Sequence, residues 1–394
     1  MIGEGWTNPG DERARDRAPT PENPRRVAVV TGTRAEFGLL RPVMEAVRAR
    51  PELELMVIAA GSHLIQPAET FREVKRHFEV ADSIPMQVAG RTGRWADVEA
   101  LGKGVARFGR SFERLAPEWV VVLGDRIEAF AAASAASVGG LAVCHIHGGD
   151  RAEGVSDEAM RHAITKLAHL HLAASEQSAE RIRKMGERPE RVRVIGSPAI
   201  DGLDRVEPVD DATFDELGSP EVVLLLHPIG RTDEAEEHAA GITLAALDGL
   251  RVLALHPNHD PGRDGIMRAL LGAPDWVKVV KHLPRERFTA LLRRLGRDGG
   301  ALVGNSSAGL IEAAALGVPA VDIGTRQGGR EHGANVVHAI EERGAIREAV
   351  SHARGLEGPF EHPFGDGRAG ARAAAALADV DPGAPGFLRK RCVY

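Results

Sequence analysis

Short apolar runs that alternate with helical periodicity restrict the fold of this chain more than any other feature. In the first half, buried strands are expected at Arg26–Val30, Leu55–Ala59, Trp119–Leu123, Leu141–Ile146 and Arg193–Ile195. Helical patterns lie between them, for example at Phe37–Arg50 and Val98–Leu115. Parallel strands need such crossover helices, so the alternation predicts a doubly wound α/β sheet with helices on both faces.

A second series of the same kind begins near residue 221. Its strands are expected at Glu221–Leu226, Arg251–Leu255, Val277–Val280, Ala301–Val303 and Ala320–Ile323. The acidic, Pro- and Gly-containing segment from about 200 to 220 is the predicted linker. Residues 26–200 and 201–355 are therefore expected to form two Rossmann-like domains that face each other across a cleft. The tail, about 356–394, carries an Ala-rich helix at Ala369–Leu377 that the pattern assigns to neither domain.

Composition narrows the class of protein. A net charge of −6 and a pI near 6.3 argue against a nucleic-acid partner, which would favour a basic stripe. Two cysteines, Cys144 and Cys392, cannot build a disulfide framework and fit a reducing compartment. No apolar run reaches the roughly 20 residues that a membrane span needs. Residues 1–25 are rich in Pro, Arg, Asp and Glu and are expected to be a disordered leader rather than a signal peptide, so a cytoplasmic protein is predicted.

The segment Gly304–Gly309 joins a predicted strand to a predicted helix, Leu310–Leu316. Small polar residues at such a junction leave backbone N–H groups and the Ser306 and Ser307 hydroxyls at the positive end of a helix dipole, which is typical of a phosphate site. A nucleotide sugar or another phosphorylated ligand is the first hypothesis.

Polar side chains follow the strands of the first half. Arg34 comes after the first strand, where a guanidinium can bind phosphate or simply lie on the surface. His63 follows the second strand, and Asp125 and Arg126 follow the strand at Trp119–Leu123. Asp125 is either a helix N-cap or a carboxylate directed to the cleft. A G-x-G-x-x-G dinucleotide motif is absent from these turns.

The densest polar segment is His145–Glu158. Its glycines permit close approach of a ligand, and its side chains supply general acids and bases. The candidates in it are His147, Asp150, Glu153 and Asp157. A metal site is disfavoured, because the two histidines lie at a strand end rather than at a helical i, i+4 spacing, and no cysteine adds a ligand. A helix is expected to follow at Ala159–Leu172.

The strand ends of the second half add further candidates. They are His227, Asn258, Lys281, His282, Glu312 and Arg326, of which Glu312 suits ribose hydroxyls. Gly328 to Asn335 is interpreted as another helix start. Arg34, Ser306, Ser307 and Arg326 together describe a diphosphate clamp that needs no metal.

These segments, in this order, resemble the hydrolysing UDP-N-acetylglucosamine 2-epimerases and their relatives in nonulosonic (sialic and legionaminic) acid synthesis. The matching strings are Thr-Gly-Thr-Arg-Ala-Glu at 31–36, Gly-Ser-His-Leu-Ile at 61–65, Gly-Asp-Arg at 124–126, His-Ile-His-Gly-Gly-Asp at 145–150, Arg-His-Ala-Ile-Thr-Lys-Leu-Ala-His at 161–169, His-Pro at 227–228, Pro-Asn at 257–258, Val-Lys-His at 280–282, Gly-Asn-Ser-Ser at 304–307 and Gly-Thr-Arg-Gln at 324–327. Each string is weak alone, but ten in order are specific.

The resemblance implies the two-domain fold of GT-B glycosyltransferases, a tail that returns to the first domain, no cofactor, and a homodimer or homotetramer. It implies that UDP is held by the second domain together with Arg34. It also implies that Asp125, Asp157 and the 147–153 loop face the sugar, with Arg126 and His63 beside them. Sialic-acid members usually have Glu where His147 stands, so Asp150 or Glu153 replaces that glutamate here, as in the branch that acts on diacetamido sugars.

The implied reaction is elimination of UDP to a glycal, followed by hydration to a free 2-epimerised sugar. Departure of UDP acidifies the C2–H, and a carboxylate removes that proton. Three alternatives stay open at this point: a non-hydrolysing epimerase, a GT-B glycosyltransferase, and a protein that binds the nucleotide sugar without turnover.

Overall fold

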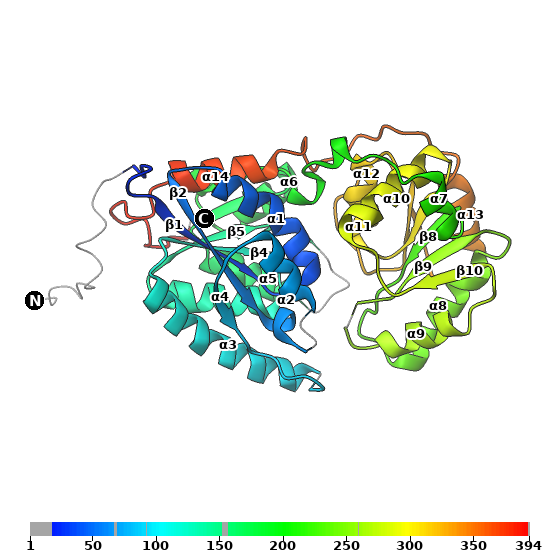
Figure 1. Cartoon of the computed structure of the whole chain (residues 1–394), viewed down its shortest axis with the longest axis horizontal. Helices are drawn as coiled ribbons and strands as arrows, with labels where there is room; N and C mark the ends of the chain where they lie inside the picture. Colours follow the sequence, from blue (N-terminus) through cyan, green and yellow to red (C-terminus); the bar gives the residue numbers. More distant parts are fainter. Residues whose placement is uncertain (1–17, 67–68, 92, 152–156, 259, 393–394) are drawn as a thin grey trace, which may run out of the picture.

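The computed structural model describes residues 18–66, 69–91, 93–151, 157–258 and 260–392. It contains two parallel sheets side by side (Figure 1), which confirms the prediction of two doubly wound α/β units. The first sheet has seven strands in the order β3-β2-β1-β4-β5-β6-β7, and the second has six in the order β10-β9-β8-β11-β12-β13. In both, the strand order reverses next to the first strand of the unit, and ligands of such sheets bind at that reversal, beyond the carboxyl ends of the strands.

The first lobe comprises the seven-stranded sheet and the helices that cover it. Its strands are β1 Arg25–Thr31, β2 Leu53–Ala60, β3 Val80–Ile84, β4 Trp119–Leu123, β5 Ala142–Ile146, β6 Leu170–Ala173 and β7 Val192–Val194. Its helices are α1 Arg34–Arg48, α2 Glu69–His77, α3 Arg94–Leu115, α4 Ile127–Val138, α5 Glu158–Leu167, α6 Glu176–Lys184 and, from the end of the chain, α14 Ala369–Asp379.

The second lobe comprises the six-stranded sheet and its helices. Its strands are β8 Val222–Leu225, β9 Val252–Leu255, β10 Val277–Val280, β11 Ala301–Gly304, β12 Ala320–Ile323 and β13 Val336–Ala339. Its helices are α7 Asp211–Glu216, α8 Asp233–Ala246, α9 Arg263–Leu271, α10 Arg285–Arg297, α11 Ser307–Leu310, α12 Glu312–Ala315 and α13 Arg343–Ala353.

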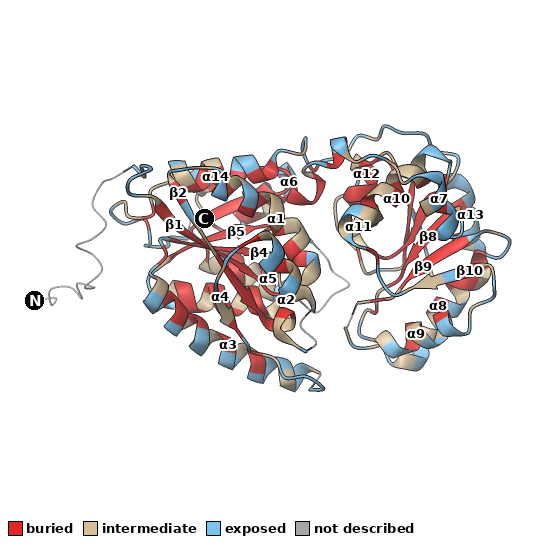
Figure 2. Ribbon diagram, in the orientation of Figure 1, coloured by how far each residue is buried: buried red, intermediate tan, exposed pale blue. Residues whose placement is uncertain are grey.

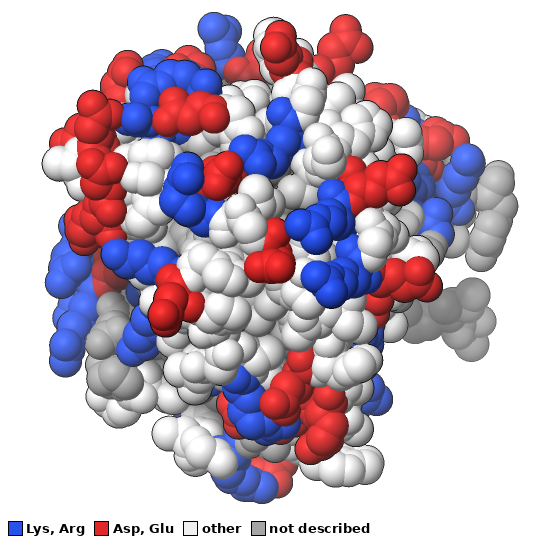
Figure 3. All heavy atoms as spheres, turned by 90° about the vertical axis from the view of Figure 1, so that its right-hand side faces the viewer, with Lys and Arg blue, Asp and Glu red and all other residues white. Residues whose placement is uncertain are grey.

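Both faces of each sheet are buried, which explains why the strands read as continuous apolar runs. In β1, Val27 and Val29 pack with α1 and α14, whereas Ala28 and Val30 pack with α3 and α4. Buried residues concentrate in the strands and on the inner sides of the helices (Figure 2). On the outer face of the second lobe, acidic and basic side chains are interspersed (Figure 3).

The C-terminal segment closes the first lobe. Helix α14 lies alongside α1 (Figure 1), and its Ala373 and Leu377 are buried in the same core. Arg25, at the start of β1, donates from Nη1 to the carbonyl oxygens of Leu377 at 2.8 Å and Val380 at 3.0 Å. The two segments that cross between the lobes also touch, because Ser197 N–H donates to the Phe364 carbonyl at 2.8 Å.

Several sequence expectations about secondary structure are wrong. The expected helix Ala159–Leu172 ends at Leu167, and Leu170–Ala173 form strand β6 beside β5. The residues from Gly328 to Asn335 do not start a helix; they lead into β13. The edge strands β3 and β13 were not expected. Short segments with a mixed pattern cannot be assigned by periodicity alone, and edge strands carry polar residues that hide the strand signal.

The expected helix Leu310–Leu316 is also not continuous. It consists of α11 and α12, separated at Ile311, whose φ of −104° and ψ of −71° interrupt the helix. Two four-residue helices have a weaker dipole than one continuous helix. Anion binding at this turn stays a prediction, one that depends more on the Ser306 and Ser307 hydroxyls and backbone N–H groups than on a helix dipole.

Within the described residues, no helix is both long and apolar enough to span a bilayer. Residues 1–17 of the expected leader lie outside the described residues, and β1 already begins at Arg25.

Candidate active site

Carboxylates and arginines gather where β4 ends and α5 begins. Arg161, in α5, forms an ion pair with Asp125 and donates from Nη1 to the His147 carbonyl at 3.3 Å. Asp157 directly precedes α5, and its charge acts on both Arg126 and Arg161. Burial alone would lower the pKa of Arg161, but the carboxylates around it, Asp125 foremost, raise it above its ordinary value.

Arg126 connects this group to the second lobe. Its Nη1 lies 3.4 Å from Oδ1 of Asp260, in the loop after β9. Burial by itself lowers the pKa of Arg126. The negative charges of Glu128 and Asp260 outweigh this effect and raise the pKa above its ordinary value. Asp260 in turn accepts a hydrogen bond from Asn258 Nδ2 at 2.5 Å. The ends of β4 and β9 therefore meet through charged side chains.

A hydrogen-bonded set in the second lobe surrounds Asn305. His227 and Asn305 exchange two hydrogen bonds of 2.8 Å, backbone N–H to Oδ1 and Nδ2 to carbonyl. Arg326 donates from Nη1 to the Asn305 carbonyl at 3.0 Å. Asn258 N–H donates to His227 Nδ1 at 3.2 Å, which leaves the ring proton on Nε2. Burial and the Arg326 charge lower the pKa of His227 to about 3, so its ring is neutral.

Arg326 also lies within the electrostatic range of the first lobe. Burial lowers its pKa, and the carboxylates of Asp260 and Asp125 act in the opposite direction. Asp125 and Arg326, which the sequence assigns to the sugar and to the diphosphate, therefore act on one another across the two lobes.

The other residues expected to hold UDP lie at neighbouring strand ends. Ser306 caps α11, with its Oγ accepting from Ala308 N–H at 3.4 Å. Glu312 is buried and pairs with Arg285 Nη1 at 3.2 Å. Ser307, the first residue of α11, is half-buried.

Arg34 and His282 approach each other from opposite lobes. Arg34 begins α1, and its Nε lies 3.5 Å from Glu73 Oε2. Burial and the Arg34 charge lower the pKa of His282 to about 4. Lys281 is exposed at the end of β10.

His147 and Asp150 form a buried network under this group. Asp150 Oδ2 lies 2.7 Å from His147 Nδ1, and its Oδ1 accepts from Ser178 Oγ at 2.8 Å. The other ring nitrogen of His147 lies 3.0 Å from Ser197 Oγ. Although burial opposes the effect, the His147 ring holds the pKa of Asp150 well below its usual range. Both ring nitrogens of His147 are thus used within the protein. Glu153, the alternative candidate, lies outside the described residues.

His63 is fully buried in the first lobe. Its ring nitrogens each lie 3.0 Å from a hydroxyl, Nε2 from Thr31 and Nδ1 from Thr70. Burial, followed by the charge of Arg34, lowers its pKa to about 4. These contacts place His63 beneath the turn after β1, where it holds that turn to α2.

Two buried glutamates support the same turns. Glu36 accepts from Gly32 N–H at 2.7 Å, and burial raises its pKa to about 8. The Glu128 side chain fills the space beside Gly32 and Gly61: a Cβ at Gly32 would lie 2.6 Å from Glu128 Cγ. Neither glycine can carry a side chain while Glu128 is there.

Sequence reasoning did not select Arg161, Asp260 or Arg330. Arg330 Nη2 lies 3.7 Å from Asp150 Oδ2, and the adjacent Glu331 accepts a hydrogen bond from Ser175 Oγ. The expected helix start at Gly328–Asn335 concealed this loop, and Arg161 looked like one of several charges on a helix surface. The sequence did contain one indication of a role for Arg161: it lies three residues after Glu158 on a half-buried helix, a spacing at which two side chains can interact.

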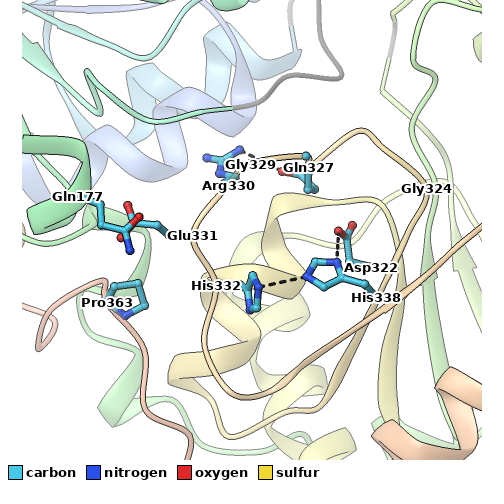
Figure 4. Close-up of a pocket in the computed structure, with 11 residues that line it drawn as sticks. Gln177, Asp322, Gly324, Gln327, Gly329, Arg330, Glu331, His332, His338 and Pro363 are labelled. Carbon is cyan, nitrogen blue, oxygen red and sulfur yellow. Dashed lines mark hydrogen bonds and ion pairs between the residues drawn. The ribbon is translucent and has the colours of Figure 1, made fainter. Parts of the chain in front are cut away.

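Within the described part of the chain, no group of three or more His, Cys, Asp or Glu side chains is arranged to hold a metal ion. A cavity of about 530 Å³ lies beside the β12–β13 loop, lined by Asp322, Arg330 and Glu331 among others (Figure 4). It borders the back of the loop that carries Arg326.

Comparisons with known proteins agree on one family. A family model for UDP-N-acetylglucosamine 2-epimerase matches residues 45–378. A UDP-N-acetylglucosamine 2-epimerase of Neisseria meningitidis serogroup B is 33% identical over 352 residues, which cover 86% of this chain and 89% of that protein. A hydrolysing UDP-N,N'-diacetylbacillosamine 2-epimerase of Legionella pneumophila is also 33% identical, over 374 residues, covering 90% and 96%.

The fold has solved counterparts. The crystal structure of UDP-GlcNAc 2-epimerase from Neisseria meningitidis bound to UDP-GlcNAc superimposes with a TM-score of 0.75 at 19% identity, covering 90% of this chain and 100% of that one. This likeness confirms the expected GT-B-like arrangement of the two sheets.

Proposed function

Because the chain belongs to the UDP-N-acetylglucosamine 2-epimerase family, and is thus a 2-epimerase of a UDP-N-acetylglucosamine-type substrate, we propose that it is a hydrolysing enzyme. Its products are free UDP and a free 2-epimerised sugar that serves nonulosonic acid synthesis. The hydrolysing Legionella pneumophila relative, matched over nearly its whole length, supports this reading.

The observation that carries the proposal is the approach of Asp125 to the arginine-rich end of the second lobe. Arg326 and Asp260 from the second lobe and Arg126 and Arg161 from the first surround it with alternating charge. We assign diphosphate binding to Arg34, Ser306, Ser307 and Arg326, with His227, Asn258, Lys281, His282 and Glu312 holding the remainder of UDP.

In the first step, the C1–O bond to UDP breaks and the diphosphate leaves with the electron pair. Arginine guanidinium groups and hydroxyl donors stabilise that charge. The developing positive charge at C1 acidifies the C2–H, and a carboxylate removes the proton, which gives the glycal. Asp125 and Asp157 share the roles of base and acid in this proposal.

In the second step, water adds across the glycal. Its hydroxyl bonds to C1, and C2 receives a proton on the face opposite the one that lost it, which inverts C2. Arg161 is a positioning residue here, because it holds Asp125 and the His147 backbone at once. The His147–Asp150–Ser197 network holds the loop that carries these groups.

The test is NMR of the purified chain in D₂O with UDP-N-acetylglucosamine and with its 4-acetamido-6-deoxy analogue. We expect free UDP and a free 2-epimerised sugar with deuterium at C2 from at least one substrate. Accumulation of a UDP-linked epimer without free UDP would contradict hydrolysis, and product without deuterium would contradict elimination.

One variant and a matched control test whether Asp125 takes part in the reaction. Asp125→Asn is expected to reduce UDP release by at least about a thousandfold, as loss of a general base does. Asp264→Asn, an exposed aspartate on α9, is the matched control and should leave the rate unchanged. Near-normal turnover of Asp125→Asn would remove Asp125 from the mechanism.

A further inference from the structure

Two histidines meet where the loop between β12 and β13 enters β13, His332 on the loop and His338 in the strand. The Nε2 atoms of His332 and His338 lie 3.1 Å apart, their ring centroids are separated by 4.7 Å, and the ring planes are inclined at 75°. Figure 4 shows the two rings facing each other beside the cavity described above. Neither residue belongs to the set assigned to the epimerase reaction.

The contacts of the other ring nitrogens determine where the protons are. His332 Nδ1 lies 2.9 Å from the Gly333 carbonyl, which can only accept, so this nitrogen carries the proton. His338 Nδ1 lies 3.0 Å from Asp322 Oδ2 and donates to that carboxylate. In neutral rings bonded this way, both Nε2 atoms present bare lone pairs to each other.

Two lone pairs at 3.1 Å repel unless an electrophile joins them. One additional proton in the hydrogen-bonded series Asp322–His338–His332 would join the two nitrogens, and so would one metal ion. A straight N–H···N bond along both ring axes would separate the centroids by roughly 5.3 Å. The observed 4.7 Å means that the ring axes meet at an angle. Two nitrogens each about 2.0–2.1 Å from one tetrahedral Zn²⁺ lie roughly 3.3 Å apart, close to the observed separation.

We propose that His332 and His338 bind one divalent transition-metal ion of the zinc type through their Nε2 atoms. Neutral imidazole is a common ligand of such ions. Both histidines are exposed, so water from the cavity completes the coordination.

Each of the two histidines also has the second hydrogen bond that metal-binding histidines usually make. Each ring donates its second N–H to an oxygen, one a carboxylate and one a backbone carbonyl, which orients the ring and strengthens it as a ligand. Asp322 is itself held in β12 with 3% of its surface exposed.

The ion would brace a loop that reaches the first lobe. Glu331, next to His332, accepts a hydrogen bond from Ser175 Oγ of the first lobe and lies 3.6 Å from Arg181 Nη1. His338 lies in β13, so the ion ties the outgoing part of this loop to the sheet. The site is therefore structural and uses none of the residues assigned to UDP, although the Asp322 carboxylate lies within electrostatic range of Arg326.

The experiment is a calorimetric titration of the full chain with Zn²⁺ near neutral pH, after removal of bound metal with a chelator. Cys392 is exposed and could compete for the ion, so every protein carries Cys392→Ser. The variants are His332→Gln, His338→Gln, the double variant, Asp322→Asn, and His352→Gln as an exposed-histidine control on α13.

We expect one site that each single ligand variant weakens by at least about tenfold and that the double variant lacks. Asp322→Asn should weaken binding by about 10–100-fold, as loss of an outer-shell carboxylate does. His352→Gln should bind as the parent does. Equal titrations for the parent and the double variant would overturn the proposal and mean that a proton alone joins the rings. An equal loss in His352→Gln would overturn it in favour of adventitious binding.

Discussion

Arg126 and Asp260 form an ion pair, with Nη1 and Oδ1 3.4 Å apart, that joins the end of β4 in one lobe to the loop after β9 in the other. The side chain of Arg126 is 36% exposed and that of Asp260 is 34% exposed, so solvent partly screens the pair. Its importance lies in position, since it brings the carboxylates of the first lobe to the residues of the second lobe that we propose bind UDP.

Asp260→Asn should weaken this connection and lower kcat/KM about two- to fivefold, the effect of losing a half-exposed pair. The double variant Arg126→Gln/Asp260→Asn should be less impaired than the product of the single losses, because the two residues act together. Steady-state release of UDP measures both. Multiplicative losses would show that the residues act independently.

Arg326→Ala should weaken UDP binding by about 10–100-fold, because a buried guanidinium that contacts diphosphate contributes about 1.5–3 kcal/mol. Arg326→Lys should recover only part of the affinity, since a single ammonium cannot reproduce the forked geometry. Arg297→Ala, an exposed arginine on α10, is the control. Calorimetry with UDP gives the affinities, and an unchanged value for Arg326→Ala would contradict the clamp.

Glu36 should make stability depend on pH. Its pKa rises from 4.5 to about 8 on folding, mainly through burial, so the folded state binds the proton more tightly than the unfolded state. The stabilisation is complete below about pH 4.5 and is lost as the pH rises through about 8. Relative to Glu36→Gln, the parent should therefore lose ~3–5 kcal/mol of unfolding free energy over that range.

Urea denaturation of the parent and Glu36→Gln at several pH values checks this expectation. Glu54→Gln, on the exposed side of β2, should follow the parent at every pH. A constant difference between the parent and Glu36→Gln across the range would contradict the assignment.

Gly304→Ala should destabilise the second lobe. Gly304 has a φ of +141°, and a Cβ there would lie 1.9 Å from the Leu225 carbonyl oxygen of the neighbouring strand. Strain and displacement of β8 together should cost ~2–4 kcal/mol. Gly344→Ala, in open space on α13, should be neutral or stabilising by up to ~1 kcal/mol. Chemical denaturation distinguishes them, and equal stability of the two variants would contradict the packing argument.

Strongly periodic segments predicted the fold well. β4 and β12 have the bounds that their apolar runs indicated, because strands buried on both faces leave a continuous apolar pattern, and the edge strand β10 also begins and ends where its apolar run does. Strands β3 and β6 were not predicted. β3 is an edge strand with polar residues, and β6 has only four residues directly after a helix, so neither shows a clear hydrophobic periodicity. The family resemblance, drawn from ten ordered strings, is confirmed by the family model.

The sequence predicted which residues lie together at the strand ends better than it predicted their partners. Strand-end position selected His227, Asn258 and Arg326, and the structure joins them around Asn305, while their role in binding UDP stays a prediction. The partner of Asp125 could not be identified in the same way, because Arg161 is 36 residues away and only the packing of α5 against the sheet brings them together. The catalytic roles proposed for the residues that face the sugar remain predictions, and Asp125→Asn tests the role proposed for Asp125.

The attachment of α14 to α1, with Arg25 bonded to the carbonyls at its end, has a consequence for biosynthesis. Residues 369–380 leave the ribosome after all the other helices and strands that the structure describes, so β1 lacks its contact with α14 when the second lobe has already been synthesised. The lobe translated first is thus completed last, and a nascent chain stalled before α14 would present α1 and the start of β1 to chaperones.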